Sequence, residues 1–327
     1  MLSSEELDAL VSVLEIAGRK FRKNKTTEET ADEDITIPSL EFMGIQIYGV
    51  DEPSMTTSQS NNKISWDNIA GYDHQKRQIE DTILLALRHP EVYDGIAHKT
   101  RSKFESNTPR ALLFEGPPGT GKTSCARVIA NQAGVPLLYV PLEIIISKWF
   151  GESERSLGRI FSVANDFPNG AIIFLDEIDA LAGARDSGTH EFSRRILSVL
   201  LQQIDGFVQK KKVILIAATN RKQDLDPALI SRFNSSIIFG LPDHDARMGI
   251  IAKYAKHLTR SDIDEFAEIT KGMSGRDIRD ICEQAERTWA SKVIRGQASI
   301  HGKEDDPPNL EEYVESVHER RKALLNI

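Results

Sequence analysis

Apolar runs and helical patterns alternate along the middle of the chain. Helical patterns follow Lys122 and Gly151 and occupy residues 196–204. The apolar runs beside them have the length and composition of buried strands, and in chain order they are ALLFE, PLLYV, AIIFLDE, VILIAATN and SIIFG. Alternation of this kind predicts an α/β fold, in which a parallel sheet is covered by helices on both faces.

Beyond residue 242 the strand pattern stops, and apolar positions recur only at helical spacing. The stretches with this spacing are MGIIAKYAKHL, DIDEFAEIT, GRDIRDICEQAERTWASKVI and NLEEYVESVHERRKALL. They predict a small all-helical domain over residues 243–327, which follows an α/β domain over residues 63–242.

Residues 1–62 have a different character. Ser3 and Glu6 form a capping-box pattern, which predicts that a helix begins there. Its apolar face either packs on the main domain or docks a partner, because the pattern fixes a buried face without showing what buries it. Residues 26–62 are rich in Thr, Ser, Glu and Asp apart from the apolar piece LEFMGIQIYGV, so most of this segment is predicted to be a linker.

Composition limits the classes of function. The net charge of -8 argues against a surface built mainly to bind nucleic acid, so no nucleic-acid partner is expected. Cys125 and Cys282 have neither disulfide nor metal-ligand spacing and suit a reducing intracellular compartment. The longest apolar runs fall short of the roughly 18 residues that a membrane span needs, so none is expected. The acidic N-terminus lacks the features of a targeting peptide, which favours the cytoplasm and leaves an organelle open.

A glycine-rich turn separates the first predicted strand from the next helix. Residues 116–123 read GPPGTGKT, which fits the phosphate-loop pattern G-x-x-x-x-G-K-[ST] in the strand and helix context that this pattern needs. A turn that merely ends a strand is the alternative, and this context disfavours it. Lys122 would reach the β- and γ-phosphates of a bound triphosphate, and Thr123 would ligate Mg²⁺. The predicted nucleotide-binding residues are Gly116, Pro117, Pro118, Gly119, Thr120, Gly121, Lys122, Thr123 and Ser124.

Polar side chains end two of the other predicted strands. AIIFLDE ends in Asp176, which could hold Mg²⁺ through water, and Glu177, which could polarise a water against the γ-phosphate. VILIAATN ends in Asn220, which could orient the same water. An acidic turn without a catalytic role is the alternative for the carboxylates, and the preceding phosphate loop disfavours it. These patterns predict an enzyme that hydrolyses a bound nucleoside triphosphate.

With these motifs the chain resembles the AAA-type ATPases from about Ile64 to Arg321. Further segments that carry the resemblance are WDNIAGYD, LRHPEVYDG, ATNRKQDLDPALISRF and GMSGRDIRDICEQA. The resemblance implies a P-loop NTPase fold with a helical lid and, as cofactors, ATP and Mg²⁺. It also implies that the segment around Gly71 packs on the adenine and that Asn220 senses the γ-phosphate.

The same resemblance identifies Arg232 as an arginine finger that reaches the nucleotide of a neighbouring subunit. A finger in trans implies a ring, expected to be a homohexamer. Many members carry a second arginine three residues later, where this chain has Ser235. Either one finger suffices or another arginine, such as Arg221, contributes.

Residues 147–155, SKWFGESER, resemble the central-pore loop of the family. By this resemblance Lys148, Trp149 and Phe150 would project into the channel of the ring and grip an extended polypeptide. Core residues ahead of a helix are the alternative, since exposed aromatic pairs are uncommon. Residues 183–190 resemble a second pore loop, and residues 205–207, DGF, resemble an intersubunit signal.

No HExxH protease motif occurs, so the chain resembles the protein-remodelling members, such as spastin and katanin, more than the membrane proteases. The expected function is an unfoldase, a translocase or a disassembly factor that acts as a ring on a protein substrate. One alternative is a nucleic-acid-dependent ATPase of the clamp-loader kind, against which the acidic charge and the aromatic loop count. Another is an ATP-bound assembly scaffold, against which the presence of Glu177 counts.

Overall fold

The computed structural model describes residues 40, 44–49, 65–143, 145, 153–182, 187–206, 213–297 and 307–325. All of them belong to one compact unit, Ile37–Ile327. The predicted N-terminal helix, most of the predicted linker and the predicted pore-loop residues Lys148, Trp149 and Phe150 lie outside the described residues.

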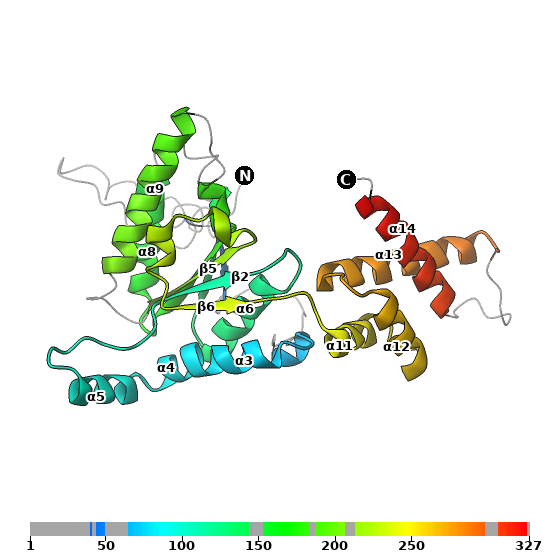
Figure 1. Cartoon of the computed structure of the whole chain (residues 1–327), viewed down its shortest axis with the longest axis horizontal. Helices are drawn as coiled ribbons and strands as arrows, with labels where there is room; N and C mark the ends of the chain where they lie inside the picture. The colour runs from blue at the N-terminus through cyan, green and yellow to red at the C-terminus, as the bar shows by residue number, and fades with distance from the viewer. Residues whose placement is uncertain are drawn as a thin grey trace, which may run out of the picture. The chain divides into compact units, whose positions relative to one another are not determined.

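A six-stranded sheet forms the centre of the α/β part (Figure 1). The strand order is β1-β3-β4-β5-β2-β6, and β2 to β6 pair in parallel. Every residue of β5 is buried, because helices cover both faces and leave no strand face to solvent. The strands are β1 (Gln46–Tyr48), β2 (Ala111–Glu115), β3 (Leu137–Pro141), β4 (Ala171–Asp176), β5 (Val213–Thr219) and β6 (Ser235–Ile238).

The edge strand β1 corrects the linker prediction for residues 46–48. It lies within the apolar piece LEFMGIQIYGV and pairs antiparallel with β3, with Gln46 opposite Tyr139. The Arg127 guanidinium lies 4.3 Å from the centroid of the Tyr48 ring and donates a hydrogen bond to the Tyr48 hydroxyl (2.6 Å). A strand of three residues is too short to show a period in the sequence, so only the pairing reveals it.

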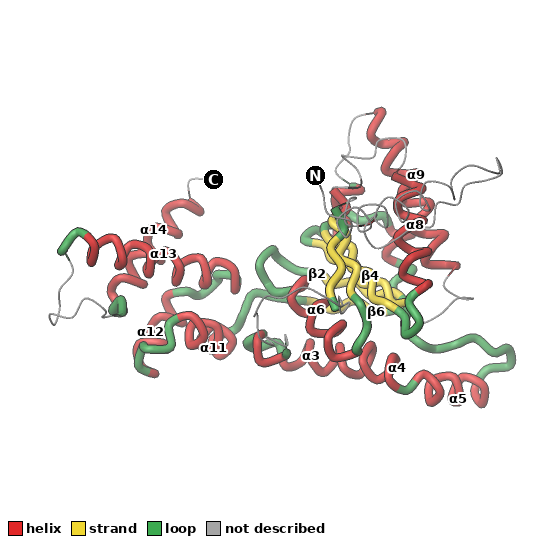
Figure 2. Tube along the Cα trace, turned by 180° about the vertical axis from the view of Figure 1, so that it is seen from behind, coloured by secondary structure: helices red, strands yellow, loops and turns green. Residues whose placement is uncertain are grey.

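Helices pack on both faces of the sheet (Figure 1 and Figure 2). α6 contacts β3, β4 and β5, whereas α8 contacts β4 and packs against α9. The apolar face of α6 joins the strands in a core that includes Ile129, Phe174 and Ile216, each fully buried. The helices of this part are α3 (Asp73–Ile79), a π-helical turn (Glu80–Leu84), α4 (Leu85–Arg88), α5 (Pro90–Thr100), α6 (Lys122–Ala133), α8 (Ser153–Asp166), α9 (Ser187–Gly206) and α10 (Pro227–Ile230).

Four helices follow the sheet and have an apolar core of their own: α11 (His244–Tyr254), α12 (Arg260–Ile269), α13 (Gly275–Ile294) and α14 (Leu310–Leu325). Phe266 and Tyr313, both fully buried, belong to this core. α12 and α13 begin at capping boxes, with Thr259 and Ser274 as their N-caps. The predicted fold class, a parallel α/β sheet followed by a helical lid, is confirmed.

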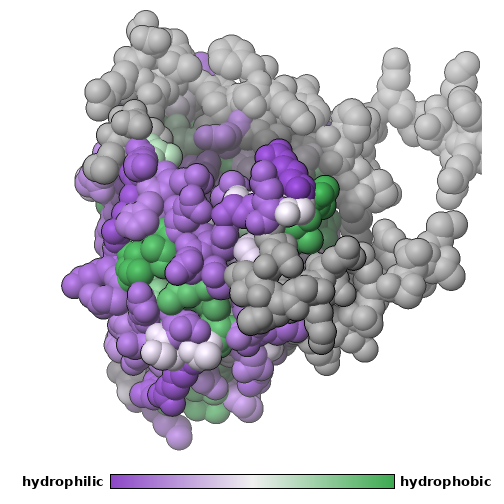
Figure 3. Space-filling model, turned by 90° about the vertical axis from the view of Figure 1, so that its right-hand side faces the viewer, coloured by the Kyte–Doolittle hydropathy of each residue, from purple (hydrophilic) through white to green (hydrophobic). Residues whose placement is uncertain are grey.

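One face of the described part is shown in Figure 3 and is largely polar. In Figure 3, hydrophilic side chains cover most of the coloured face and hydrophobic ones form small patches. Within the described ranges, no helix is both long and apolar enough to cross a lipid bilayer.

Candidate active site

The predicted phosphate loop connects β2 to α6. Gly116 has a φ of +148°, and a Cβ atom there would lie 2.0 Å from the carbonyl oxygen of Phe239, just after β6. Gly119 and Gly121 also have left-handed φ values, +78° and +92°. Glycine is needed at Gly116 because any side chain would collide with backbone, and at the other two because L residues rarely adopt this conformation. At these three glycines the loop backbone can therefore approach a bound anion without obstruction from a side chain.

Lys122, the first residue of α6, directs its ammonium group back across this loop. Its Nζ atom donates hydrogen bonds to the carbonyl oxygens of Gly116 (2.7 Å) and Pro117 (2.9 Å) and to Oδ1 of Asn220 (2.8 Å). Burial lowers the pKa of Lys122, and nearby carboxylates, Asp176 foremost, oppose this effect. A phosphate in the loop would offer the buried ammonium a full negative charge in place of neutral carbonyl oxygens, so the arrangement suits an anion.

The carboxylate of Asp176 receives hydrogen bonds on both oxygens. Its Oδ2 atom accepts from the hydroxyls of Thr123 and Tyr139 (both 3.1 Å), and its Oδ1 atom accepts from the backbone N–H of Glu177 (3.1 Å). A hydroxyl beside a carboxylate suits Mg²⁺, which proteins bind through one or two such oxygens together with substrate phosphates and water. The predicted metal ligands Thr123 and Asp176 therefore fit Mg²⁺ held jointly with a nucleotide.

Glu177 leaves β4 in a left-handed conformation, with a φ of +55°. Glu177 and Tyr72 are the only non-glycine residues with positive φ in the described ranges, and both line the same cavity. Such backbone costs about 1–3 kcal/mol and is found most often at functional sites. Burial raises the pKa of Glu177, and the neighbouring carboxylates Glu143 and Asp176 raise it further. A carboxylate with a raised pKa is a better proton acceptor than an ordinary glutamate.

Asn220 follows β5, the neighbour of β2 in the sheet. Asp179 orders this turn, because its Oδ1 atom accepts from the Thr219 hydroxyl (2.8 Å) and from the backbone N–H of Asn220 (3.2 Å). The ends of parallel strands meet at one edge of a sheet, where α/β proteins bind their ligands. At this edge the structure brings together five of the predicted residues: Lys122, Thr123, Asp176, Glu177 and Asn220.

The five residues line one side of a cavity of about 280 Å³. This volume lies close to the lower limit usual for small-ligand sites. Residues 68–70 and Tyr72 line a second part of the cavity, and lid residues that include Ile250 and Tyr254 line a third. The predicted polar groups therefore line the cavity at the phosphate loop, and the lid contributes both apolar and basic side chains.

Gly71 does not line the cavity itself, although its neighbours Ala70 and Tyr72 do. Its φ is +68°, and a Cβ atom there would lie 2.3 Å from the Cβ atom of Ala246 on α11. Gly71 thus serves the close approach of this segment to the lid. Gly116 and Pro117 likewise lie beside the cavity, where their carbonyl oxygens accept from Lys122.

Basic lid residues at the cavity are absent from the sequence prediction. Arg276 and Arg279 line the cavity from α13, and the backbone N–H of Arg276 donates to the carbonyl oxygen of Gly119 (3.2 Å). Lys253 on α11 also lines it and donates to the carbonyl oxygen of Asp67. The alternating charges of GRDIRD are typical of any exposed helix, so the pattern gives no signal that two of them face a site.

Arg232, the predicted finger, does not line the cavity of its own chain. Its Nε atom contacts both carboxylate oxygens of Asp205 (3.0 Å each), and its Nη1 atom donates to the carbonyl oxygen of Ala228 (3.0 Å). Asp205 begins the DGF segment that resembles an intersubunit signal. Ser235 is the first residue of β6, opposite Leu112 of β2.

Comparison with known proteins identifies the family. Residues 112–241 match the family described as "ATPase family associated with various cellular activities (AAA)". The chain is similar to the crystal structure of the FIGL-1 AAA domain in complex with ADP, with a TM-score of 0.68 and 27% sequence identity over 90% of this chain and 92% of that one. The chain belongs to the AAA family of ATPases. The fold and the recognition of the family from sequence are thereby confirmed.

Two further relatives agree with this assignment. A second structure of the FIGL-1 AAA domain has a TM-score of 0.67 and 27% identity, and it covers 89% of this AAA chain and 92% of its own. Fidgetin-like protein 1 of Caenorhabditis briggsae is 34% identical over 232 residues, which are 69% of this chain and 37% of that protein. The chain therefore matches little more than a third of that relative's length.

Proposed function

We propose that this AAA protein binds ATP in the cavity between the phosphate loop and the lid and hydrolyses it to ADP and phosphate. The observation that carries the proposal is the meeting of Lys122, Asp176 and Glu177 at one edge of the sheet. These groups supply a phosphate-binding cation, a metal-binding carboxylate and a proton acceptor. The bound ADP of the similar FIGL-1 domain supports the choice of an adenine nucleotide.

In this mechanism Lys122 leaves its carbonyl acceptors and compensates the charge of the β- and γ-phosphates. Glu177 orients a water and accepts its proton, while Asn220 contacts the γ-phosphate and helps to orient the same water. Mg²⁺, held by Thr123 and Asp176, would neutralise phosphate charge. The test is release of phosphate by the purified chain. Release that needs added Mg²⁺ and stops with EDTA is expected, and its absence at protein concentrations that form oligomers would contradict the proposal.

The proposed active unit is a ring in which Arg232 completes the site of the next subunit. Arg232 and Asp205 have side chains that are 33% and 57% exposed. Exposed pairs of this kind contribute only about 0–1 kcal/mol, so a neighbour's phosphate can compete for the arginine. Assembly would then exchange a pair within one chain for a contact between chains.

The proposed work of the ring is the remodelling of a protein substrate gripped by Lys148, Trp149 and Phe150. If Trp149 lines the channel, Trp149→Ala should leave the folding stability and the basal ATPase rate nearly unchanged, because an aromatic side chain that faces the channel adds little to the core. Unfolding of a tagged model substrate should fall sharply as the grip is lost. The measurement pairs thermal unfolding with ATPase and substrate-unfolding assays on the same preparation.

Trp289→Ala is the matched control, because Trp289 is buried in α13. Truncation of a buried tryptophan typically costs about 3–5 kcal/mol, so this variant should lose stability. If Trp149→Ala instead behaves like the control, with a large drop in melting temperature and a loss of all activities together, Trp149 is a core residue. The proposed grip on a protein substrate then fails.

A further inference from the structure

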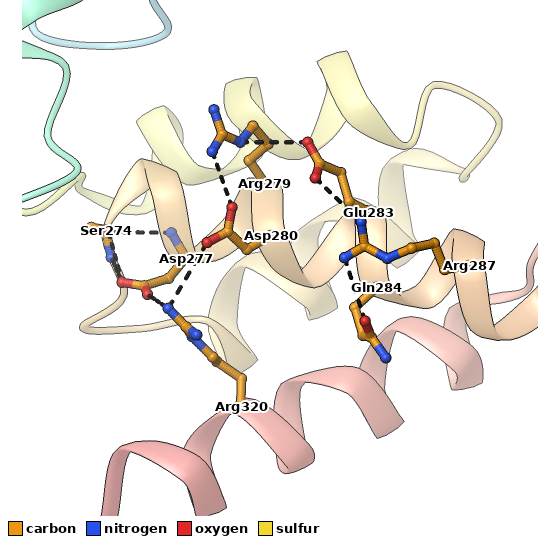
Figure 4. A network of polar contacts seen from close by, with 8 residues as sticks. All are labelled: Ser274, Asp277, Arg279, Asp280, Glu283, Gln284, Arg287 and Arg320. Carbon is orange, nitrogen blue, oxygen red and sulfur yellow. Dashed lines mark hydrogen bonds and ion pairs between the residues drawn. The ribbon is translucent and has the colours of Figure 1, made fainter. Parts of the chain in front are cut away.

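An ion pair ties the C-terminal helix α14 to the first turn of α13 (Figure 4). The Nη2 atom of Arg320 lies 2.8 Å from Oδ1 of Asp277 and 3.9 Å from Oδ2 of Asp280. In Figure 4 the Arg320 side chain reaches from α14 toward both carboxylates. The Arg320 and Asp277 side chains are 37% and 21% exposed, so the pair is partly screened from water and its hydrogen bond is charge-assisted.

Asp277 uses its other oxygen to hold the N-cap of α13. Its Oδ2 atom accepts from the backbone N–H (3.0 Å) and the hydroxyl (2.6 Å) of Ser274, and its own N–H donates to the Ser274 hydroxyl (3.2 Å). Burial alone would raise the pKa of Asp277, but hydrogen bonds from Ser274 and Arg320 outweigh it and leave the pKa below its usual value. The carboxylate is therefore charged at neutral pH and joins Arg320 to the cap.

The cap in turn touches the phosphate loop. A Cβ atom on Gly119 would lie 2.6 Å from the Ser274 hydroxyl and 2.7 Å from the Arg276 Cβ atom. The backbone N–H of Arg276 donates to the carbonyl oxygen of Gly119 (3.2 Å), and Gly275 and Arg276 line the cavity. A continuous series of contacts thus runs from Arg320 through Asp277 and Ser274 to the phosphate loop.

We propose that Arg320 is a positioning residue for the nucleotide: through Asp277 it fixes the start of α13 against the phosphate loop, so that the C-terminal helix sets nucleotide affinity. The inference rests on the proposed ATP site. A capping box without Arg320 would still begin α13, because Ser274 and Asp277 satisfy each other. Arg320 fixes the orientation of the Asp277 carboxylate. The carboxylate in turn holds Gly275 and Arg276 in position beside the phosphate loop.

A second ion pair between the same helices provides a matched control. Lys292 contacts both carboxylate oxygens of Glu312 (2.8 and 2.7 Å). Lys292 lies fifteen residues after Asp277 on α13, roughly 22 Å away along the helix axis. Loss of this pair should loosen α14 without reaching the phosphate loop.

The test compares Arg320→Met, Arg320→Lys and Glu312→Gln in the full chain. Binding of mant-ATP, a fluorescent ATP analogue, is titrated at a temperature where thermal unfolding shows every variant to be folded. Arg320→Met should raise the Kd for mant-ATP roughly threefold to tenfold. Arg320→Lys should recover part of the loss, and Glu312→Gln should bind as the wild type does, even if its melting temperature falls as far.

Three results would overturn the inference. One is an unchanged Kd in Arg320→Met, and another is a Kd that rises in Glu312→Gln in proportion to lost stability, which would make general lid stability the cause. The third is the absence of mant-ATP binding by the wild type, which would overturn the proposed ATP site as well. That case is distinguished from the other two by the wild-type titration alone.

Discussion

Lys122→Ala is expected to abolish nucleotide binding at ordinary concentrations. Lys122 is buried, and its ammonium group donates hydrogen bonds to the carbonyl oxygens of Gly116 and Pro117 in the phosphate loop. Without it the negative charge of the phosphates would be poorly compensated, and removing one partner of a buried charge pair typically costs about 3–5 kcal/mol. The Kd for mant-ATP should therefore rise on the order of a hundredfold to a thousandfold.

Lys256→Ala is the control, because it removes the same charge from an exposed position in the turn after α11. It should bind mant-ATP as the wild type does. The melting temperature of Lys122→Ala without nucleotide should stay near that of the wild type, since Gly116 is half-buried and Pro117 exposed, and water can replace the lost donor. An affinity of Lys122→Ala within a few-fold of wild type would contradict the role of Lys122 in phosphate binding.

Arg232→Ala is expected to lose most of the ATPase rate while each subunit keeps its affinity for ATP. Arg232 does not line the cavity of its own chain, so its loss leaves the binding groups in place. An arginine finger is worth roughly 10³- to 10⁵-fold in rate. Arg221→Ala is the comparison, since Arg221 is the other candidate for the arginine finger. A loss in Arg221→Ala with none in Arg232→Ala would move the finger to Arg221.

Mixing variants separates a finger in trans from one in cis. In a mixed ring, an Arg232→Ala subunit keeps its own Glu177 and can use the arginine of a Glu177→Gln neighbour, so some sites are complete. Partial recovery of phosphate release is expected on mixing two nearly inactive proteins. Co-assembly without any recovery would contradict the trans assignment.

The sheet and the phosphate loop are predictable from sequence because their signals are local. Strands buried on both faces are continuous apolar runs, and the glycines of residues 116–121 are demanded by backbone geometry rather than by distant contacts. Gly116 illustrates this, since a Cβ atom there would meet the Phe239 carbonyl oxygen. Asp176, Glu177 and Asn220 are predictable for a related reason, because polar residues that end parallel strands meet at one edge.

The remaining parts of the site depend on contacts between distant residues. Tyr139 has the appearance of an ordinary strand aromatic, and only the pairing of β3 with β4 places its hydroxyl on Asp176. Arg276 reaches the cavity because α13 begins beside Gly119, a placement that no local pattern encodes. Pairing and docking of this kind are set by tertiary packing, which a single sequence does not display.

Hydrolysis of ATP at this site is proposed to use Glu177 as the proton acceptor. Glu177→Gln keeps the size of the side chain and removes its basicity, so ATP binding should persist while turnover is lost. The most direct measurement is a pair of assays on this variant, mant-ATP binding and steady-state phosphate release, beside the wild type. The expected result is a Kd within a few-fold of wild type and a rate lower by about 10²- to 10⁴-fold. Phosphate release by Glu177→Gln at the wild-type rate would contradict it.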